Sequence, residues 1–279
     1  PYTTLFRSLV LALTFSAYAK DVQTTWALGP FTRPVNAQPA IRPNANTLFD
    51  CPLRQEPVGW ESRHTFNPAA TVLNGRICVL YRAEDERGNG TIGSYTSRLG
   101  MAFSDDGVTL DCEPKPVFFP KEDAQKEFEW SGGCEDPRLA AGPDGTYVMT
   151  YTQYAGRHPN AGTPGWRIGL ATSKDLRSWT KHGSPFTGTP FEKTKIKSAG
   201  ILQKPVIGRL VAAMVNNKYW MYFGEASVNL ASSPDLIHWT PVTDGNGKLV
   251  EIMKTRKGYF DSNLTEVGPP PILTNDGIV

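Results

Sequence analysis

The chain has 279 residues, of which 39% are hydrophobic and 20% are charged, so its composition is that of a folded protein and excludes a disordered one. Its 29 Lys and Arg residues nearly balance its 27 Asp and Glu residues, and this balance provides no basic field for nucleic acid or for an acidic membrane surface. The 26 Gly, 23 Pro and 7 Trp residues indicate many turns and abundant aromatic surface.

Residues 1–19 are expected to lie outside the folded domain. Leu9–Ala17 is an apolar run, and the following Ala17-Tyr18-Ala19 has the small-x-small pattern of a secretory cleavage site. The run is too short to span a bilayer, which needs about 20 residues. Residues 1–8 resemble the translation of a sequencing adapter. We therefore predict adapter-derived residues plus a damaged signal peptide at 1–19, and a secreted or periplasmic protein.

The cysteines and histidines show no metal-binding spacing. An oxidising compartment would allow the cysteines to pair, but their wide spacing leaves disulfide formation open, and no C-x-x-C motif occurs. We expect neither a metal nor a cofactor. The residues concerned are Cys51, Cys78, Cys112 and Cys134, and His64, His158, His182 and His238.

A short motif occurs three times, with the pattern A-x-S-x-D-x-x-x-[W/L] beginning at Ala102, Ala171 and Ala231. The copies are 69 residues (171−102) and 60 residues (231−171) apart. Each copy follows an apolar, aromatic-rich segment that itself follows a tight turn. We expect the Ser and Asp of each motif to close a turn by hydrogen bonds from side chain to backbone, and the Trp or Leu to pack between sheets.

Strands and turns repeating at about sixty residues are typical of β-propeller blades. A β-sandwich is the alternative all-β fold, but it would not repeat one motif in this way. Near the C-terminus, Asn275-Asp276-Gly277 predicts a hairpin turn. The chain stops two residues later, inside what should be the next strand, so we expect a propeller that lacks its closing strands.

The segment Gly132–Arg138 is a candidate site, because it is polar where a plain strand would be apolar. A carboxylate that begins the innermost strand of a blade points into the central funnel, and Asp136 fits this placement. Arg138 lies two residues further on the same strand face and would lower the pKa of Asp136. A structural ion pair between Asp136 and Arg138 is the alternative interpretation.

An ordered set of motifs makes the chain resemble glycoside hydrolase family 130. The motifs are N-P-A-A at 67–70, L-Y-R-A-E-D at 80–85, G-G-C-E-D-P-R at 132–138, Y-T-Q-Y at 151–154, the repeat at 171–179, K-S at 197–198, Y-F-G-E at 222–225 and F-D-S-x-L-T-E-x-G-P-P at 260–270. The resemblance implies a five-bladed β-propeller whose final blade is missing, with residues 20–279 as the incomplete catalytic domain. It also implies action on β-mannosides with inversion, by phosphorolysis in some members and hydrolysis in others.

The resemblance further implies the site residues. It makes Asp136 the acid, whose proton is thought to pass through a sugar hydroxyl, and Glu225 or Glu266 the base of a hydrolase. We expect these three carboxylates to face one funnel. The implied substrate-binding residues are Asn67, Arg82, Glu84, Asp85, Arg138, Tyr151, Lys197, Ser198 and Asp261.

The nature of the acceptor decides between two functions. Phosphate needs a cationic clamp, for which Lys197, Lys204 and Arg82 are candidates, whereas water needs a carboxylate base about 6.5–9.5 Å from the acid. The two glutamates and the signal peptide favour a secreted inverting β-mannoside hydrolase. A phosphorylase and a non-catalytic carbohydrate-binding propeller are the alternatives. The expected partner is an oligosaccharide, with no nucleic acid or membrane, and the linkage and oligomeric state stay open.

Overall fold

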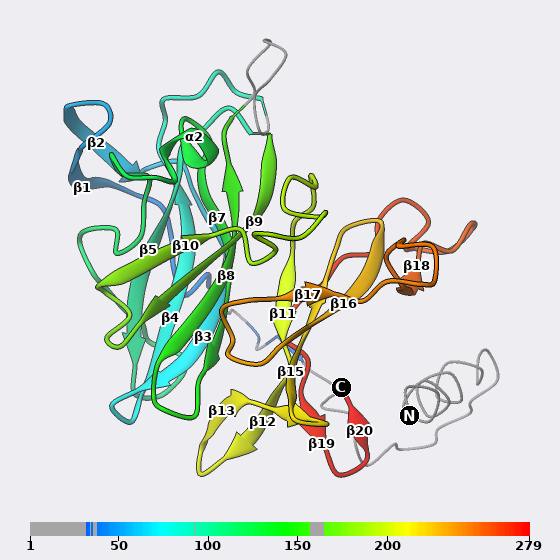
Figure 1. Cartoon of the computed structure of the whole chain (residues 1–279). Helices are drawn as coiled ribbons and strands as arrows, with labels where there is room; N and C mark the ends of the chain where they lie inside the picture. The colour runs from blue at the N-terminus through cyan, green and yellow to red at the C-terminus, as the bar shows by residue number, and fades with distance from the viewer. Residues whose placement is uncertain (1–31, 34, 36–37, 92, 157–164) are drawn as a thin grey trace. The chain divides into compact units, whose positions relative to one another are not determined.

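In the computed structural model, the described residues are 32–33, 35, 38–91, 93–156 and 165–279, and their regular structure is almost entirely β-strand (Figure 1). Residues Gln38–Ile278 form one compact unit. The expected adapter residues and signal peptide at 1–19 lie outside the described residues. Within the described part of the chain, no helix is both long and apolar enough to cross a membrane.

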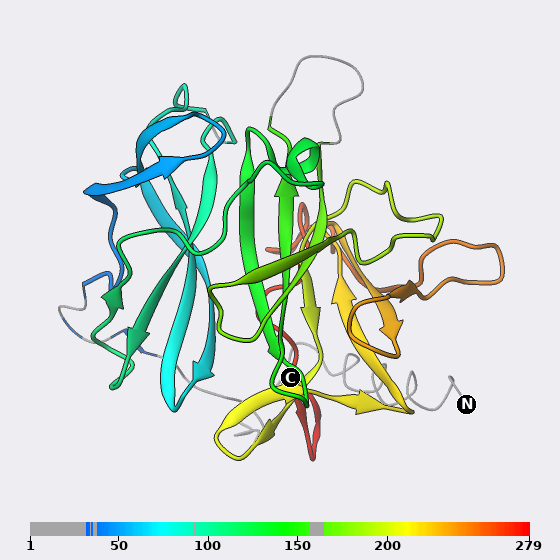
Figure 2. The ribbon, with the colours of Figure 1, turned by 60° about the vertical axis from the view of Figure 1, so that its left-hand side comes forward.

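Three antiparallel units of four strands follow one another along the chain (Figures 1 and 2). The first unit is β3 (His64–Leu73), β4 (Arg76–Glu84), β5 (Ser97–Ser104) and β6 (Asp111–Cys112); the second is β7 (Gly133–Ala141), β8 (Tyr147–Tyr154), β9 (Trp166–Ser173) and β10 (Trp179–Gly183); the third is β11 (Ala199–Ile201), β15 (Lys218–Phe223), β16 (Ser227–Ser233) and β17 (Thr240–Pro241).

The remaining elements surround these units. They are β1 (Asn44–Cys51), β2 (Glu56–Glu61), α2 (Lys126–Glu129), β12 (Gln203–Val206), β13 (Arg209–Ala212), β14 (Met214–Val215), β18 (Glu251–Lys254), β19 (Leu273–Thr274) and β20 (Gly277–Ile278). The hairpin of β19 and β20 turns at Asn275–Asp276, as the sequence predicts.

The repeated motif closes a turn after the third strand of each unit, as expected. In the second unit, Ser173 Oγ accepts the N–H of Leu176 at 2.8 Å, and Asp175 Oδ1 accepts the N–H of Ser178 at 2.6 Å. Asp106 and Asp235 bind the backbone in the same way in the first and third units. The serine and aspartate oxygens thus accept hydrogen bonds from backbone N–H groups that have no backbone acceptor in the tight turn.

The hydrophobic core lies between successive units. One cluster joins the first unit to the second through residues such as Leu80 and Met149, and another joins the second to the third through Leu170 and Met221. Trp239, the last residue of the third motif, is buried in the second cluster, so the packing role expected of it is confirmed. A third cluster joins β1 and β2 to the first unit.

The all-β fold class is therefore confirmed, but a ring is not. The first and second units belong to one sheet, through a parallel contact between β5 and β7, and the third unit forms a separate sheet. Among the described strands, no sheet closes on itself. The number of blades stays a prediction.

The turn aspartates generate a testable prediction. Hydrogen bonds from the backbone lower the pKa of Asp175 to about 2, and the N–H of Ser178 has the largest effect. Stability from this carboxylate is present above its ordinary pKa near 4 and is lost as the pH falls towards 2. We expect Asp175→Asn to lower the melting temperature by about 2–4 °C at pH 7, and the difference to vanish near pH 2. Thermal unfolding followed by circular dichroism, with Asp276→Asn as the control, measures this.

Candidate active site

Each unit places one strained polar residue in or directly before its first strand. Asn67 and Asp136 lie in the bulges of β3 and β7, with φ angles of +43° and +49°, and Ser198, with φ of +63°, directly precedes β11. A bulge re-aims a side chain that regular pleating would direct elsewhere. Each such residue costs about 1–3 kcal/mol and persists only where its surroundings hold it. The three residues therefore mark a candidate site.

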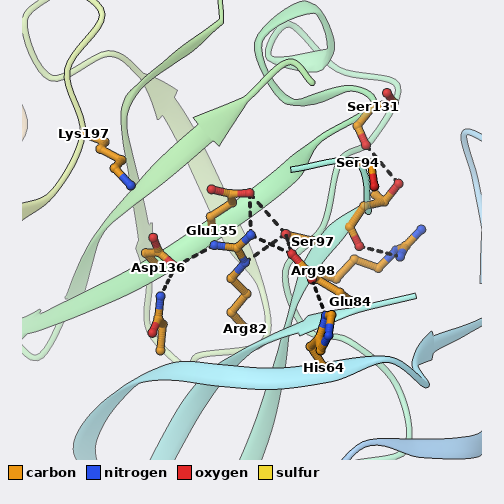
Figure 3. A network of polar contacts seen from close by, with 12 residues as sticks. His64, Arg82, Glu84, Ser94, Ser97, Arg98, Ser131, Glu135, Asp136 and Lys197 are labelled. Carbon is orange, nitrogen blue, oxygen red and sulfur yellow. Dashed lines mark hydrogen bonds and ion pairs between the residues drawn. The ribbon is translucent and has the colours of Figure 1, made fainter. Parts of the chain in front are cut away.

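Asp136 is held by two neighbours from the first unit (Figure 3). Its Oδ1 accepts hydrogen bonds from Asn67 Nδ2 at 2.8 Å and from Arg82 Nη1 at 3.0 Å. The side chain is 9% exposed, so these bonds are little screened by water. The structure thus brings together the expected residues Asn67, Arg82 and Asp136.

Arg82 contacts two further carboxylates. Its Nη2 donates to Glu84 Oε1 at 2.7 Å and to Glu135 Oε1 at 2.8 Å, while its Nε donates to Ser97 Oγ at 3.0 Å. One buried guanidinium therefore faces three carboxylates, two of them on β7 and one on its own strand. Glu84 was expected in the site from the sequence, whereas Glu135 was not among the expected site residues.

The two adjacent carboxyl groups on β7 differ in their proton affinity. Burial alone would raise the pKa of Asp136, but the charge of Arg82 and the hydrogen bond from Asn67 outweigh burial, so the pKa lies below its ordinary value. Burial raises the pKa of Glu135 to about 7, since the opposing charge of Arg82 does not compensate for it. Glu135 therefore has a higher affinity for a proton than its neighbour Asp136.

Gly133 allows β7 to start close to β5. A Cβ atom at this position would lie 2.1 Å from the carbonyl oxygen of Ser97, and its φ of +110° disfavours any other residue. Gly133 thus permits a close backbone approach, which places Ser97 beside Glu135.

A second group of expected residues lies next to Asp136. Ser198 Oγ donates to Glu266 Oε1, and Lys197 Nζ lies 3.8 Å from the same oxygen. Lys197 points towards Asp136 and Glu135 in Figure 3, and its charge lowers the pKa of both. Lys197 therefore links Asp136 to Glu266.

Arg138 does not pair with the carboxylate of Asp136, so the ion pair considered from the sequence is wrong. Its guanidinium donates to the carbonyl oxygens of Val267 at 2.6 Å and Gly268 at 2.8 Å, and to the backbone oxygen of Asp136 at 3.0 Å. Arg82 reaches the carboxylate instead, from the neighbouring unit. Arg138 fastens the loop that carries Glu266 to β7.

The backbone next to Glu225 contacts Ser198, but the Glu225 side chain has another partner. The N–H of the preceding Gly224 donates to the carbonyl of Ser198 at 2.9 Å. The carboxylate of Glu225 itself accepts a hydrogen bond from Trp166 Nε1 at 2.7 Å, so it is bonded to β9 and not to Ser198 or Lys197.

Three other expected substrate contacts have different partners. Asp85 forms an ion pair with Arg98 at 2.8 Å, in which both side chains are 1% exposed, so it is structural. Tyr151 packs in the core and donates to Glu129 at 2.6 Å. Asp261 pairs with Arg256 at 2.7 Å in the loop after β18. The corresponding motifs give the residue type but not the direction of the side chain.

The four cysteines are free thiols, three of them buried and Cys112 exposed. In the described ranges, no group of three or more His, Cys, Asp or Glu side chains could hold a metal ion. The described side chains of the site are carboxyl groups, a guanidinium, a lysine and hydroxyl groups.

The charge balance around Arg82 generates a testable prediction. Arg82→Gln leaves buried carboxylates without their counterion, and we expect it to lower the free energy of unfolding by about 3–5 kcal/mol at pH 7. The loss should shrink towards pH 5, since the carboxylates then take up protons and lose their charge. Urea unfolding at both pH values measures it. Arg76→Gln, which removes an exposed ion pair with Asp105, should have a much smaller effect at either pH.

Comparisons with known proteins agree on one family. The sequence model of glycoside hydrolase family 130, described as beta-1,4-mannooligosaccharide phosphorylase, matches residues 32–279. The 1,2-beta-oligomannan phosphorylase of Thermoanaerobacter sp. (strain X514) is 32% identical over 218 residues, which cover 78% of this chain. The chain spans 63% of the length of that relative.

Two solved structures share the fold at higher identity. A glycosyl hydrolase from Bacteroides ovatus is 51% identical, with a TM-score of 0.85 over 91% of this chain and 70% of its own. A structure described by the words "The GH130 family of mannoside phosphorylases contains glycoside hydrolases that target beta-1,2 mannosidic linkages in Candida mannan" is 49% identical. Its TM-score is 0.86 over 93% of this chain and 71% of its own.

Proposed function

The chain belongs to glycoside hydrolase family 130, and we propose that the protein cleaves a terminal β-mannosidic bond of an oligomannan with Asp136 as the acid. The observation that carries the proposal is the placement of Asp136 in a strained bulge, where Arg82 and Asn67 hold its carboxyl group. The names of the relatives, which act on β-mannosides, support the substrate class.

The acid role requires a proton that Asp136 lacks at neutral pH. A general acid works best when its pKa lies near the operating pH, and the pKa of Asp136 lies below its ordinary value. A bound sugar that excludes water from Asp136 would raise this pKa. A proton that passes through a sugar hydroxyl, as the family resemblance implies, would also relax the distance required between the carboxyl group and the leaving oxygen.

Phosphate is the better supported acceptor. The family description and the relative from Thermoanaerobacter name phosphorylases, which favours the phosphorylase alternative over the hydrolase expected from the sequence. Lys197 would contribute positive charge for phosphate next to Asp136. The guanidinium of Arg138, by contrast, donates to backbone carbonyl oxygens, and that of Arg82 pairs with carboxylates. Neither arginine is therefore favoured as a phosphate ligand.

Water is the second candidate, and two observations favour it. The structure that is 49% identical is described as a study of hydrolases within the family. In this chain the carboxylate of Glu266 lies beside Lys197, where it would repel a phosphate dianion and activate a water molecule. Glu266 is therefore the preferred base for hydrolysis, ahead of Glu225, which is bonded to Trp166.

The architecture and location of the whole protein are also proposals. The repeated units, with hydrophobic clusters between them, support successive blades of a five-bladed propeller, in which residues 20–279 belong to the catalytic domain. Export to the periplasm or outside the cell is supported by the sequence pattern at residues 9–19 alone.

Product analysis distinguishes the two acceptors. We expect the protein to consume β-1,2-mannobiose or β-1,4-mannobiose, and the products to be followed by chromatography with and without inorganic phosphate. Mannose 1-phosphate that forms only with phosphate would identify a phosphorylase, and free mannose at the same rate in both conditions a hydrolase. Binding of the sugars with no cleavage in either condition would instead favour a carbohydrate-binding propeller.

The acid assignment predicts a specific loss. Asp136→Asn should lower kcat by about 10²–10⁴, the usual contribution of general acid catalysis, with an unchanged circular dichroism spectrum. Asp105→Asn, at an exposed carboxylate in the first repeat turn, serves as the control and should keep full activity. An Asp136→Asn variant with near-normal kcat would show that another group is the acid.

A further inference from the structure

Two buried carboxylates share one nitrogen atom of Arg82. Its Nη2 donates to Glu84 Oε1 at 2.7 Å and to Glu135 Oε1 at 2.8 Å, and these two side chains are 5% and 10% exposed. With Asp136 on Nη1, three potential negative charges meet one positive charge. Like charges at such distances in a site of low dielectric constant disfavour full ionisation.

The Ser97 hydroxyl contacts both carboxyl groups but has too few hydrogen atoms for both contacts. Its Oγ lies 3.2 Å from Glu84 Oε1 and 3.3 Å from Glu135 Oε1, and it accepts a hydrogen bond from Arg82 Nε. A serine hydroxyl has one hydrogen atom and cannot donate to both carboxylates. If Glu135 is protonated, it can donate to Ser97 Oγ while Ser97 donates to Glu84, so that each of the two contacts has one donor.

Glu84 is the member of the pair that is better held as a carboxylate. Besides Arg82 and Ser97, it has His64, whose Nδ1 lies 2.9 Å from Glu84 Oε2. His64 is half-exposed and lines, together with Arg82 and Glu84, a cavity of about 750 Å³. The chain of contacts His64–Glu84–Arg82–Glu135 therefore runs from this cavity to the neighbour of Asp136 (Figure 3).

We propose that Glu135 carries a proton in the resting site, that the facing carboxylate of Glu84 keeps it there, and that Glu135 is a positioning residue which adjusts the proton affinity of Asp136. Burial, which raises the pKa of Glu135 to about 7, agrees with this assignment. The other charged groups that face Glu135 are Arg82 and Lys197, which oppose the proton, and Asp136, which favours it.

The consequence for Asp136 has a definite sign. Below about pH 7 Glu135 is neutral, and Arg82 then acts on Asp136 and Glu84 alone. As the pH rises, Glu135 loses its proton, and the new negative charge increases the affinity of Asp136 for a proton. Deprotonation of Glu135 would thus raise the proton affinity of Asp136 at alkaline pH and increase the small fraction of Asp136 that is protonated there.

A carboxyl titration by ¹³C NMR tests the proton directly and needs no activity. With ¹³C-labelled glutamate, one resonance should titrate near pH 7 and be absent from the spectrum of Glu135→Gln. In Glu84→Gln its midpoint should fall by about one pH unit or more, which is a tenfold loss of proton affinity. Glu113→Gln, which removes a carboxylate paired with Arg177 on the surface, should leave the midpoint unchanged.

A midpoint that stays near 7 in Glu84→Gln would show that Glu84 does not hold the proton and would contradict its proposed role, and a midpoint near 4 in the unmodified protein would overturn the proposal altogether. Should Glu84→Gln not fold, Ser97→Ala replaces it. This variant removes the hydroxyl between the two carboxyl groups while both carboxyl groups remain, and a lower midpoint is expected there too, because protonated Glu135 loses its acceptor. An unshifted midpoint in Ser97→Ala would contradict the proposed hydrogen bond between Glu135 and Ser97.

The effect on Asp136 rests on the proposed function and is tested separately by kinetics. The ratio of kcat/KM between the unmodified protein and Glu135→Gln should rise about tenfold between pH 6 and pH 8, because the glutamine cannot gain the charge. A ratio that is independent of pH would indicate a structural defect and contradict the coupling. Absence of any β-mannoside cleavage would overturn the proposed function but leave the NMR result on the proton standing.

Discussion

The buried guanidinium of Arg82 is the interaction on which the candidate site depends. It joins a carboxylate of its own strand, Glu84, to two carboxylates of the next unit, Glu135 and Asp136. Without this charge, desolvation would force protons onto these groups or drive them into water. The ion pairs therefore also hold β4 against β7, next to the close approach that Gly133 permits between β7 and β5.

The site is a product of repetition with local irregularity. Each unit repeats four strands and the same serine–aspartate turn, and hydrophobic clusters lie between successive units. Against this regular frame, Asn67, Asp136 and Ser198 depart from strand geometry in or directly before the first strands of their units. The frame supplies the rigidity that holds the three strained residues. The side chain of Asn67 contacts Asp136, and that of Ser198 contacts Glu266.

The charges around Asp136 affect whether phosphate or water can approach the site. Arg82 is committed to carboxylates and Arg138 to carbonyl oxygens, which leaves Lys197 as the cation closest to the junction between Asp136 and Glu266. A lysine attracts phosphate, whereas a glutamate beside it repels phosphate. This combination agrees with relatives that bear the names of both phosphorylases and hydrolases.

The sequence by itself determined the all-β class, the three repeated turns and the family, because turn chemistry and strand patterns are local and leave a trace in neighbouring residues. It also identified Asp136, Arg82 and Glu266 by motif. Only the tertiary structure decided which partners these residues have. The carboxylate of Asp136 pairs with Arg82 and not with Arg138, and Asp85 and Tyr151 are buried in the interior. The raised proton affinity of Glu135 likewise depends on burial and on charges brought together from different strands. Such contacts join residues tens of positions apart, and no local pattern in the chain specifies them.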